Sequence, residues 1–103
     1  MKIEVLYVPG CPNHLPAVER IRKVLMSESL QADIEGIAVH SAVAAEALEF
    51  PGSPTIRVNG TDVEPNHKNA IGLACRLYAN NEGVPSEEML RMALITAKQR
   101  DAL

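Results

Sequence analysis

The chain has 103 residues, of which 47% are apolar and 22% are charged, and this composition predicts one domain over residues 1–103 with its own hydrophobic core. Its net charge of −3 excludes the basic surface that nucleic-acid binding requires. No apolar run reaches the ~18 residues that span a bilayer, and the chain does not begin with a secretory signal. We therefore expect a soluble cytoplasmic protein with neither nucleic-acid nor membrane partners.

The first two predicted elements are a strand and a helix. Residues 2–8 form an apolar run that predicts a buried strand. Residues 12–29 predict a helix, because apolar side chains recur there at three- and four-residue spacing. Pro16 lacks the N–H that would bond back along this helix. The helix therefore either begins near Leu15 or is kinked in its first turns.

The middle of the chain predicts a strand, a short helix and a hairpin. Residues 31–39 alternate imperfectly between apolar and polar positions and predict the second strand. Residues 41–49 predict a short, alanine-rich helix with Ser41 as its N-cap. After the Pro- and Gly-rich loop 50–54, residues 55–64 predict a β-hairpin, because Asn-Gly at its centre suits a type I′ turn.

The last third of the chain contains one ambiguous and one clear segment. Residues 65–81 are ambiguous, since 70–78 could form a helix weakened by Gly72. Residues 86–100 predict the final helix, with Ser86 as its cap, acidic residues in its first turn and basic residues in its last. The resulting order is β-α-β-α-β-β-α. It predicts an α/β fold with a mixed four-stranded sheet and helices on both faces.

Cys11 is the first candidate functional residue. It lies between the first predicted strand and the first predicted helix, where free backbone N–H groups and the positive end of the helix dipole are located. Both features stabilise a thiolate, which is the nucleophilic form of cysteine. A buried, chemically inert cysteine is the alternative, but such cysteines rarely lie at an exposed helix start.

Two motifs resemble the thioredoxin superfamily over essentially the whole chain. They are Cys11-Pro12-Asn13-His14 at the first helix and Gly52-Ser53-Pro54-Thr55-Ile56 before the hairpin. The resemblance implies a thioredoxin-like fold in which Pro54 follows a cis peptide bond and lies beside the reactive cysteine. The chain departs from thioredoxins at His14, where they carry a second cysteine. Disulfide reduction by a dithiol within this motif is therefore excluded.

A second, more detailed resemblance is to small thioredoxin-like proteins labelled alkylmercury-lyase-like. It rests on the Gly-Ser-Pro-Thr block at residues 52–55 and on the Gly-Leu-Ala-Cys-Arg-Leu-Tyr block at residues 72–78. This resemblance implies chemistry with mercury or organomercurials, although a shared fold does not establish a shared reaction.

Cys75 is the second candidate thiol. The predicted hairpin returns the chain toward the end of the sheet that carries Cys11, so Cys75 can approach Cys11 from far along the sequence. The pair could act as attacking and resolving thiols or as two thiolate ligands of a soft metal. A small apolar packing role for Cys75 is the alternative.

Histidine and proline complete the candidate site. His14 could stabilise a thiolate when protonated or bind a metal when neutral, or it could simply be exposed to solvent. His40 and His67 have no motif context and are expected at the surface. Pro54 is expected to shape a groove, with the backbone of Ser53 and Thr55 offering hydrogen bonds to a substrate.

Three functions follow from these residues. The leading hypothesis is a thiol-disulfide oxidoreductase without a bound cofactor, in which Cys11 is the nucleophile and Cys75 resolves the mixed disulfide. Its partner would be a thiol or disulfide, either a protein or a small molecule. The second hypothesis is soft-metal or organomercurial handling by Cys11 and Cys75. The third is a binding module that retains the fold without chemistry.

Overall fold

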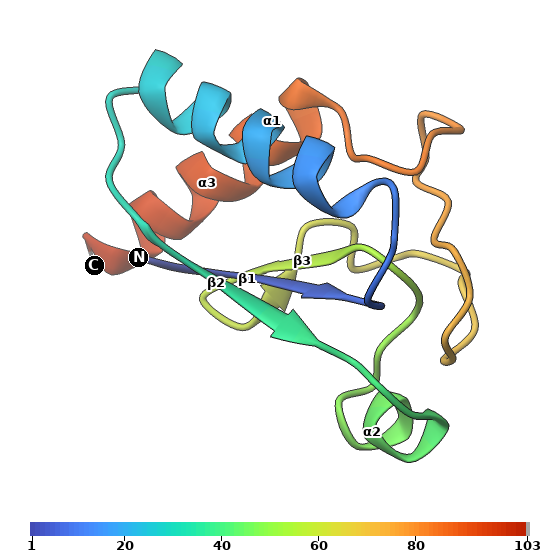
Figure 1. Cartoon of the computed structure of the whole chain (residues 1–103). Helices are drawn as coiled ribbons and strands as arrows, with labels where there is room; N and C mark the ends of the chain where they lie inside the picture. Colours follow the sequence, from blue (N-terminus) through green and yellow to red (C-terminus); the bar gives the residue numbers. More distant parts are fainter. Residues whose placement is uncertain (103) are drawn as a thin grey trace.

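A four-stranded mixed β-sheet and three helices make up the part of the chain that the computed structural model describes, residues 1–102 (Figure 1). The elements, in chain order, are β1 (Lys2–Tyr7), α1 (His14–Ser27), β2 (Asp33–Ala38), α2 (Ala42–Ala47), β3 (Thr55–Val58), β4 (Thr61–Asp62) and α3 (Glu87–Asp101). This order matches the predicted β-α-β-α-β-β-α sequence of elements.

The sheet has the strand order β2-β1-β3-β4. Strand β1 is parallel to β2, with Val5 opposite Gly36, and antiparallel to β3, with Val5 opposite Ile56. A parallel neighbour requires a crossover between the strands, and α1 supplies it. The predicted mixed sheet is therefore confirmed, and β1 lies in its interior with a neighbour on each side.

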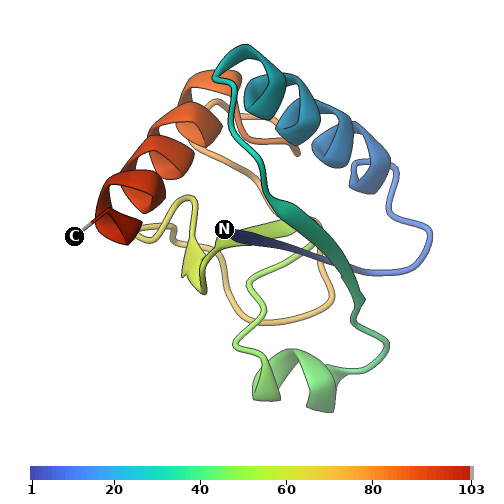
Figure 2. The same cartoon turned by 90° about the vertical axis from the view of Figure 1, so that its left-hand side faces the viewer.

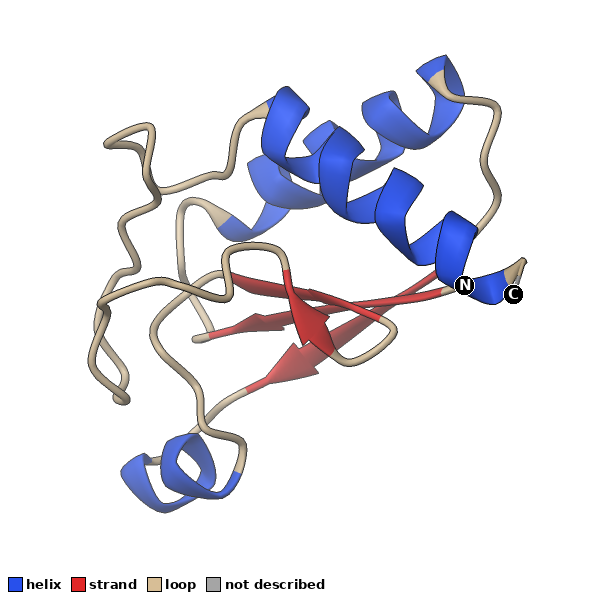
Figure 3. Ribbon diagram, turned by 180° about the vertical axis from the view of Figure 1, so that it is seen from behind, coloured by secondary structure: helices blue, strands red, loops and turns tan. Residues whose placement is uncertain are grey.

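The helices cover both faces of the sheet (Figure 3). Helices α1 and α3 lie side by side on one face, while the short α2 lies on the other (Figures 1 and 2). The larger hydrophobic core is between the sheet and the α1–α3 pair, and its fully buried members include Ile3, Val5, Ile21, Val24 and Ile56. A smaller cluster, formed by Leu6, Val39, Ala45 and Phe50, packs beneath α2. Because side chains alternate along a strand, β1 contributes to both clusters.

Helix α1 begins at His14, two residues later than the sequence predicted, and ends at Ser27. Pro16 is therefore its third residue. The first four N–H groups of a helix have no partner within the helix, so proline at this position removes no helical hydrogen bond. Of the two predicted alternatives, the late start is confirmed, and Pro16 requires no kink.

Serine caps begin the other two helices. The hydroxyl of Ser41 accepts a hydrogen bond from the Ala44 N–H at 3.1 Å and caps α2. The hydroxyl of Ser86 accepts one from the Met89 N–H, also at 3.1 Å, and caps α3. Both predicted N-caps are confirmed. A cap of this kind stabilises a helix by about 1 kcal/mol.

The β3–β4 hairpin turns at Asn59 and Gly60, as predicted. These residues have φ angles of 50° and 86°, and a type I′ turn requires positive φ at both central positions. Asn59 also fixes the turn to the start of β1. Its N–H donates to the Lys2 carbonyl and its side-chain oxygen accepts from the Lys2 N–H, both at 2.8 Å.

Residues 63–86 form a long loop between β4 and α3, which we call the β4–α3 loop. Residues 70–78, for which the sequence left a helix open, form no helix in this loop. Instead, exposed and buried residues alternate from Cys75 to Tyr78. This period of two is that of an extended chain rather than of a helix. The loop, coloured yellow to orange in Figure 1, lies at the end of the sheet where β1 leads into α1.

None of the helices between residues 1 and 102 is both long enough and apolar enough to cross a membrane.

Candidate functional site

Cys11 lies in the tight turn that joins β1 to α1. Its N–H donates to the Val8 carbonyl at 3.0 Å, and its carbonyl accepts from the His14 N–H at 3.3 Å. Gly10, with a φ of 87°, supplies the left-handed conformation in this turn. Cys11 is partly exposed and is separated by Pro12 and the N-cap residue Asn13 from His14, where α1 begins. Cys11 is therefore accessible, as predicted, and lies in the segment that leads into the N-terminus of α1.

The side chain of Asn13 connects this turn to the β4–α3 loop. A Cβ atom added at Gly83 would collide with the Asn13 amide, so the two residues are in close contact. Within residues 1–102 the Asn13 side chain makes no capping hydrogen bond to α1, although asparagine is a common N-cap. Its role here is to pack against the loop.

His14 stacks on Tyr7, with 3.6 Å between ring centroids and an angle of 5° between the rings. Gly36 of β2 lies beside both rings, since a Cβ atom there would be 3.5 Å from the Tyr7 ring and 4.0 Å from His14 Nε2. Burial lowers the pKa of His14 below its usual 6.5. The imidazole is therefore neutral near pH 7, which disfavours the predicted role of a cation that stabilises the thiolate.

Pro54 follows a cis peptide bond, as predicted. The residue before it, Ser53, is buried and accepts a hydrogen bond at its Oγ from the Val8 N–H at 3.0 Å. Val8 also accepts the Cys11 N–H bond, so the Ser53–Pro54 peptide and the cysteine turn are joined through one residue. Ser53 lies on the β3 side of β1, whereas His14 and Tyr7 lie beside Gly36 on the β2 side.

Cys75 pairs with Ser53 in an isolated parallel β-bridge. The Ser53 N–H donates to the Ala74 carbonyl at 2.9 Å, and the Ser53 carbonyl accepts from the Arg76 N–H at 3.0 Å. Two predictions can be assessed from this pairing. The β4–α3 loop does return Cys75 to the end of the sheet that carries Cys11. The expectation that Ser53 offers backbone hydrogen bonds to a substrate is wrong, because both of its backbone groups already have partners.

Both cysteines are free thiols in the structure. Cys75 is exposed and Cys11 is partly exposed, so a small reagent in solvent can reach each of them. The alternative in which Cys75 is a packed apolar residue is therefore wrong.

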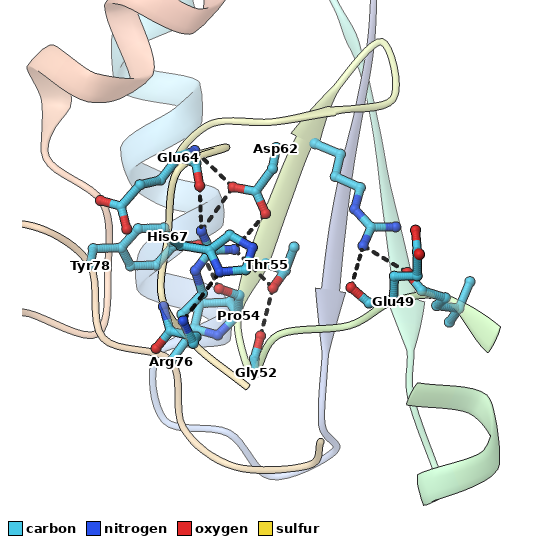
Figure 4. Close-up of polar contacts among 12 residues, drawn as sticks. Glu49, Gly52, Pro54, Thr55, Asp62, Glu64, His67, Arg76 and Tyr78 are labelled. Carbon is cyan, nitrogen blue, oxygen red and sulfur yellow. Dashed lines mark hydrogen bonds and ion pairs between the residues drawn. The ribbon is translucent and has the colours of Figure 1, made fainter. Parts of the chain in front are cut away.

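A buried polar network lies beneath this site (Figure 4). Arg76 has a fully buried side chain and forms a two-pronged ion pair with Asp62, at 2.7 and 2.8 Å. It also donates to Thr55 Oγ1 at 3.1 Å and to the Glu64 carbonyl at 3.4 Å. Four of its five N–H donors thus have acceptors, and only Nε has no partner among the described residues.

Tyr78 connects this network to the cis proline. Its hydroxyl donates to the Pro54 carbonyl at 2.6 Å, and its ring lies 4.3 Å from the Arg76 guanidinium carbon. Burial raises the pKa of Tyr78 far above its usual value of 10. The hydroxyl therefore remains protonated and keeps its role as a donor to Pro54 at physiological pH.

Arg76 is the residue that sequence reasoning missed. Asp62, Glu64 and Tyr78 can be recognised as polar residues that return toward the cysteine end, but nothing in the sequence selects them. The sequence offered no signal for this placement. Cys75 and Leu77 alternate with Arg76 and Tyr78, a pattern that predicts an exposed arginine, whereas the structure buries it. A fully buried arginine requires an acidic partner, and Asp62, on β4 beside this loop, provides one.

The remaining histidines do not join the site. His40 is exposed, and His67 accepts the Asn69 N–H within the β4–α3 loop at 3.3 Å. Within residues 1–102 no three histidine, cysteine or acidic side chains are grouped so as to hold a metal ion. A metal would therefore have to be bound by fewer protein ligands, as in a site made of two thiolates.

A hollow lies elsewhere, between the hairpin and α3. It has a volume of about 520 Å³, and its apolar lining includes Val58, Val63, Met89 and Met92. None of Cys11, His14, Pro54 and Cys75 lines it. The candidate thiol site is instead a surface site formed by the cysteine turn, the Ser53–Pro54 peptide and the segment around Cys75.

Comparison of the chain with protein-family models, with curated proteins and with solved structures finds no match.

Proposed function

We propose that this protein is a thioredoxin-like thiol protein in which Cys11 is the nucleophile of thiol-disulfide exchange. Three features support the fold assignment: the strand order β2-β1-β3-β4, the cysteine in the turn that leads into α1, and the cis peptide bond before Pro54. The position of Cys11 supports its chemical role, since the thiol is accessible and its turn leads into the N-terminus of α1.

One observation carries the proposal, namely that Ser53 joins the segments of both cysteines. Its Oγ accepts from Val8 at the base of the Cys11 turn, and its backbone pairs with the segment that contains Cys75. Two thiols far apart in the sequence are thus attached to the same buried residue. This arrangement favours a reaction that uses both cysteines over one that uses Cys11 alone.

The exchange would proceed in two steps. The Cys11 thiolate attacks one sulfur of a disulfide, forms a mixed disulfide and releases the other half as a thiolate. Cys75, as a thiolate, then attacks the Cys11 sulfur, forms the Cys11–Cys75 disulfide and releases the second half. This second step requires the two Cα atoms to come within ~7 Å of each other.

The surrounding residues would act as positioning groups. Arg76, the neighbour of Cys75, is fixed by its ion pair with Asp62. Tyr78 fixes the Pro54 carbonyl. His14 would act as a neutral stacking partner of Tyr7 at the start of α1 and not as a cation beside the thiolate.

Alkylation and oxidation of the purified protein test the proposal. With iodoacetamide at neutral pH, Cys11 is expected to react faster than Cys75 although it is the less exposed of the two, because its turn leads into the positive end of the α1 dipole. Oxidation by a small disulfide is expected to yield the internal Cys11–Cys75 disulfide, measured by mass spectrometry after peptide digestion. In Cys75→Ser, the mixed disulfide at Cys11 should accumulate instead. Equal alkylation of both cysteines, together with no internal disulfide, would contradict the proposal.

A second candidate function is the binding of a soft metal ion by the two thiolates. The two free cysteines favour it, because Hg(II) and Cu(I) accept few, soft ligands and residues 1–102 hold no group of three metal-binding side chains. Titration of the reduced protein with Hg(II) should then saturate at one ion per chain, and both Cys11→Ser and Cys75→Ser should weaken binding strongly. If neither cysteine affects either assay, the domain is a binding module without thiol chemistry.

A further inference from the structure

The edge beside the Ser53–Pro54 peptide is already occupied by the chain itself. An extended polypeptide binds a sheet edge through unpaired main-chain N–H and C=O groups. At Ser53 both groups are used, since the N–H donates to Ala74 and the carbonyl accepts from Arg76. The 74–76 segment therefore has the position that a bound polypeptide strand would have, and Cys75 is its central residue.

Close backbone contact shows that this segment is built into the fold. Gly52 has a φ of 115°, and a Cβ atom there would lie 3.0 Å from the Ala74 carbonyl oxygen and 3.2 Å from the Arg76 Cα atom. Only glycine combines this backbone conformation with so close an approach. The segment thus packs against the loop before Pro54 without space for another chain between them.

Buried groups on the inner side of the segment also resist its displacement. Arg76 is held by Asp62 and Thr55, and Tyr78 is held by the Pro54 carbonyl. Lifting the segment would separate a buried ion pair and expose both side chains, which is costly. On the outer side, Cys75 and its uncharged neighbours are exposed, with Leu73 at 41% and Leu77 at 55%.

We infer that the 74–76 segment takes the place of a polypeptide substrate at Ser53, so that the disulfide that reacts with Cys11 is a low-molecular-weight one and not part of a protein strand. This inference rests on the proposed function and narrows its substrate class. The sulfur balance is complete: one small disulfide R–S–S–R and the two protein thiols give two R–SH molecules and the Cys11–Cys75 disulfide. The small disulfide is reduced and the protein is oxidised.

Two disulfides that differ only in chain length test the inference. One is the symmetric disulfide of N-acetylcysteine methylamide, and the other is that of an unstructured peptide with the same cysteine at its centre. The probed protein is Cys75→Ser, in which the backbone pairing is retained and only Cys11 can react. Each rate of mixed-disulfide formation is divided by the rate of the same reagent with a free small thiol, which removes differences in intrinsic reactivity.

We expect the peptide disulfide to react no faster than the small one after this correction. A site that offered two main-chain hydrogen bonds would accelerate the peptide by about tenfold. A peptide that reacts faster than the small disulfide overturns the inference while leaving the proposed function intact. A Cys11 that reacts with neither reagent overturns the proposed function, and the inference falls with it.

Amide hydrogen exchange of the wild-type protein provides a test that needs no variant. The N–H groups of Ser53 and Arg76 should be protected as strongly as those in the interior of β3, because both are bonded across the bridge. Exchange of either amide as fast as in an unstructured chain would show that the edge is open and would overturn the inference.

The Asp62→Asn variant provides a further test with the two disulfides. Because this substitution weakens the anchor of Arg76, the rate of the peptide disulfide should increase relative to that of the small disulfide.

Discussion

The layered half of the molecule and the β4–α3 loop are held together by different interactions. The sheet, α1 and α3 share a core of aliphatic side chains such as Ile3, Ile21 and Leu94. The loop has no helix or named strand, and its largest fully buried side chains are Arg76 and Tyr78. The layered region therefore depends on apolar burial. The loop contributes Val63, Tyr78 and Val84 to the same core and depends in addition on directional polar contacts.

This difference determines how each region responds to change. An apolar core loses stability roughly in proportion to the atoms removed and tolerates swaps of similar volume. A buried polar network fails as a unit, because a partner left without its counterpart remains desolvated and unpaired. Both candidate thiols are attached to the boundary between the two regions, so substitutions on either side should affect the thiols differently.

The largest effect is expected from Arg76→Met. It leaves the largely buried Asp62 carboxylate without its cation and should lower the free energy of unfolding by about 3 kcal/mol, measured by urea denaturation. Arg76→Met/Asp62→Asn should recover part of this loss, because no buried charge remains and the amide oxygen can still accept the Glu64 N–H. A single variant as stable as the wild type would show that the ion pair does not hold the loop.

Ile21→Ala should affect the other region. Ile21 belongs to α1, and its side chain is fully buried in the core. Its truncation should lower the free energy of unfolding by about 2–5 kcal/mol. The folded variant should nevertheless keep the wild-type ratio of Cys11 to Cys75 alkylation rates, since the contacts at Ser53 are unchanged. A shift in that ratio would mean that the core and the thiol site are coupled more closely than their separate contacts indicate.

Gly83→Ala tests the contact between the loop and the cysteine turn. The added methyl group collides with the Asn13 amide, so either the loop or the turn must move, and overpacking of this kind costs about 1–3 kcal/mol. The rate of Cys11 alkylation should change together with stability. Gly36→Ala is the matched control, because its added Cβ meets Tyr7 and His14 only at ordinary contact distances. An equal effect of the two variants would contradict the assigned role of Gly83.

Tyr78→Phe removes the hydroxyl that donates to the Pro54 carbonyl and keeps the ring beside Arg76. The buried carbonyl loses its donor, so the free energy of unfolding should fall by about 1 kcal/mol. Tyr7→Phe serves as control and should retain the stack on His14, with a change below about 0.5 kcal/mol. If the two phenylalanine variants are equally stable, the hydroxyl of Tyr78 does not support the proline.

The smallest expected effect is a pH dependence of the free energy of unfolding, and it arises from His14. Because burial lowers its pKa, the folded state binds the proton less readily than the unfolded state does. The stabilisation that comes from the neutral His14 is therefore complete above its unfolded-state pKa of 6.5. It is lost as the pH falls through the lower pKa of the folded state. His14→Phe retains a stacking ring without a titrating group, and its stability should fall less than that of the wild type on acidification. Parallel pH profiles of the two proteins would contradict this assignment.

The sequence predicted the layered region well, for physical reasons that apply locally. Apolar spacing predicts α1, serine caps predict α2 and α3, and Asn59-Gly60 predicts the hairpin, since each signal lies within a few residues of its consequence. The resemblance to the thioredoxin superfamily implied the cis bond before Pro54, and the predicted hairpin implied the return of Cys75 to the cysteine end.

The same reasoning did not predict the contacts of the β4–α3 loop. Arg76 reaches Asp62 across 14 positions of sequence, and Ser53 meets Cys75 across a still longer interval. Such pairs are not encoded in a local period, because the chain between them is irregular. The alanine and leucine residues on both sides of Gly72 also favour a helix in isolation, and the burial of Arg76 and Tyr78 against the proline loop overrides that preference.

The burial of the Arg76–Asp62 pair also determines how this ion pair responds to ionic strength. Surface pairs such as Lys2–Glu35, at 3.0 Å and with both side chains more than half exposed, are weakened by salt, which screens charges over ~8 Å at physiological concentration. The side chain of Arg76 is inaccessible to counterions, and that of Asp62 is only 12% exposed. Added salt should thus weaken the charged contacts of the protein's surface while leaving the support beneath Cys75 in place.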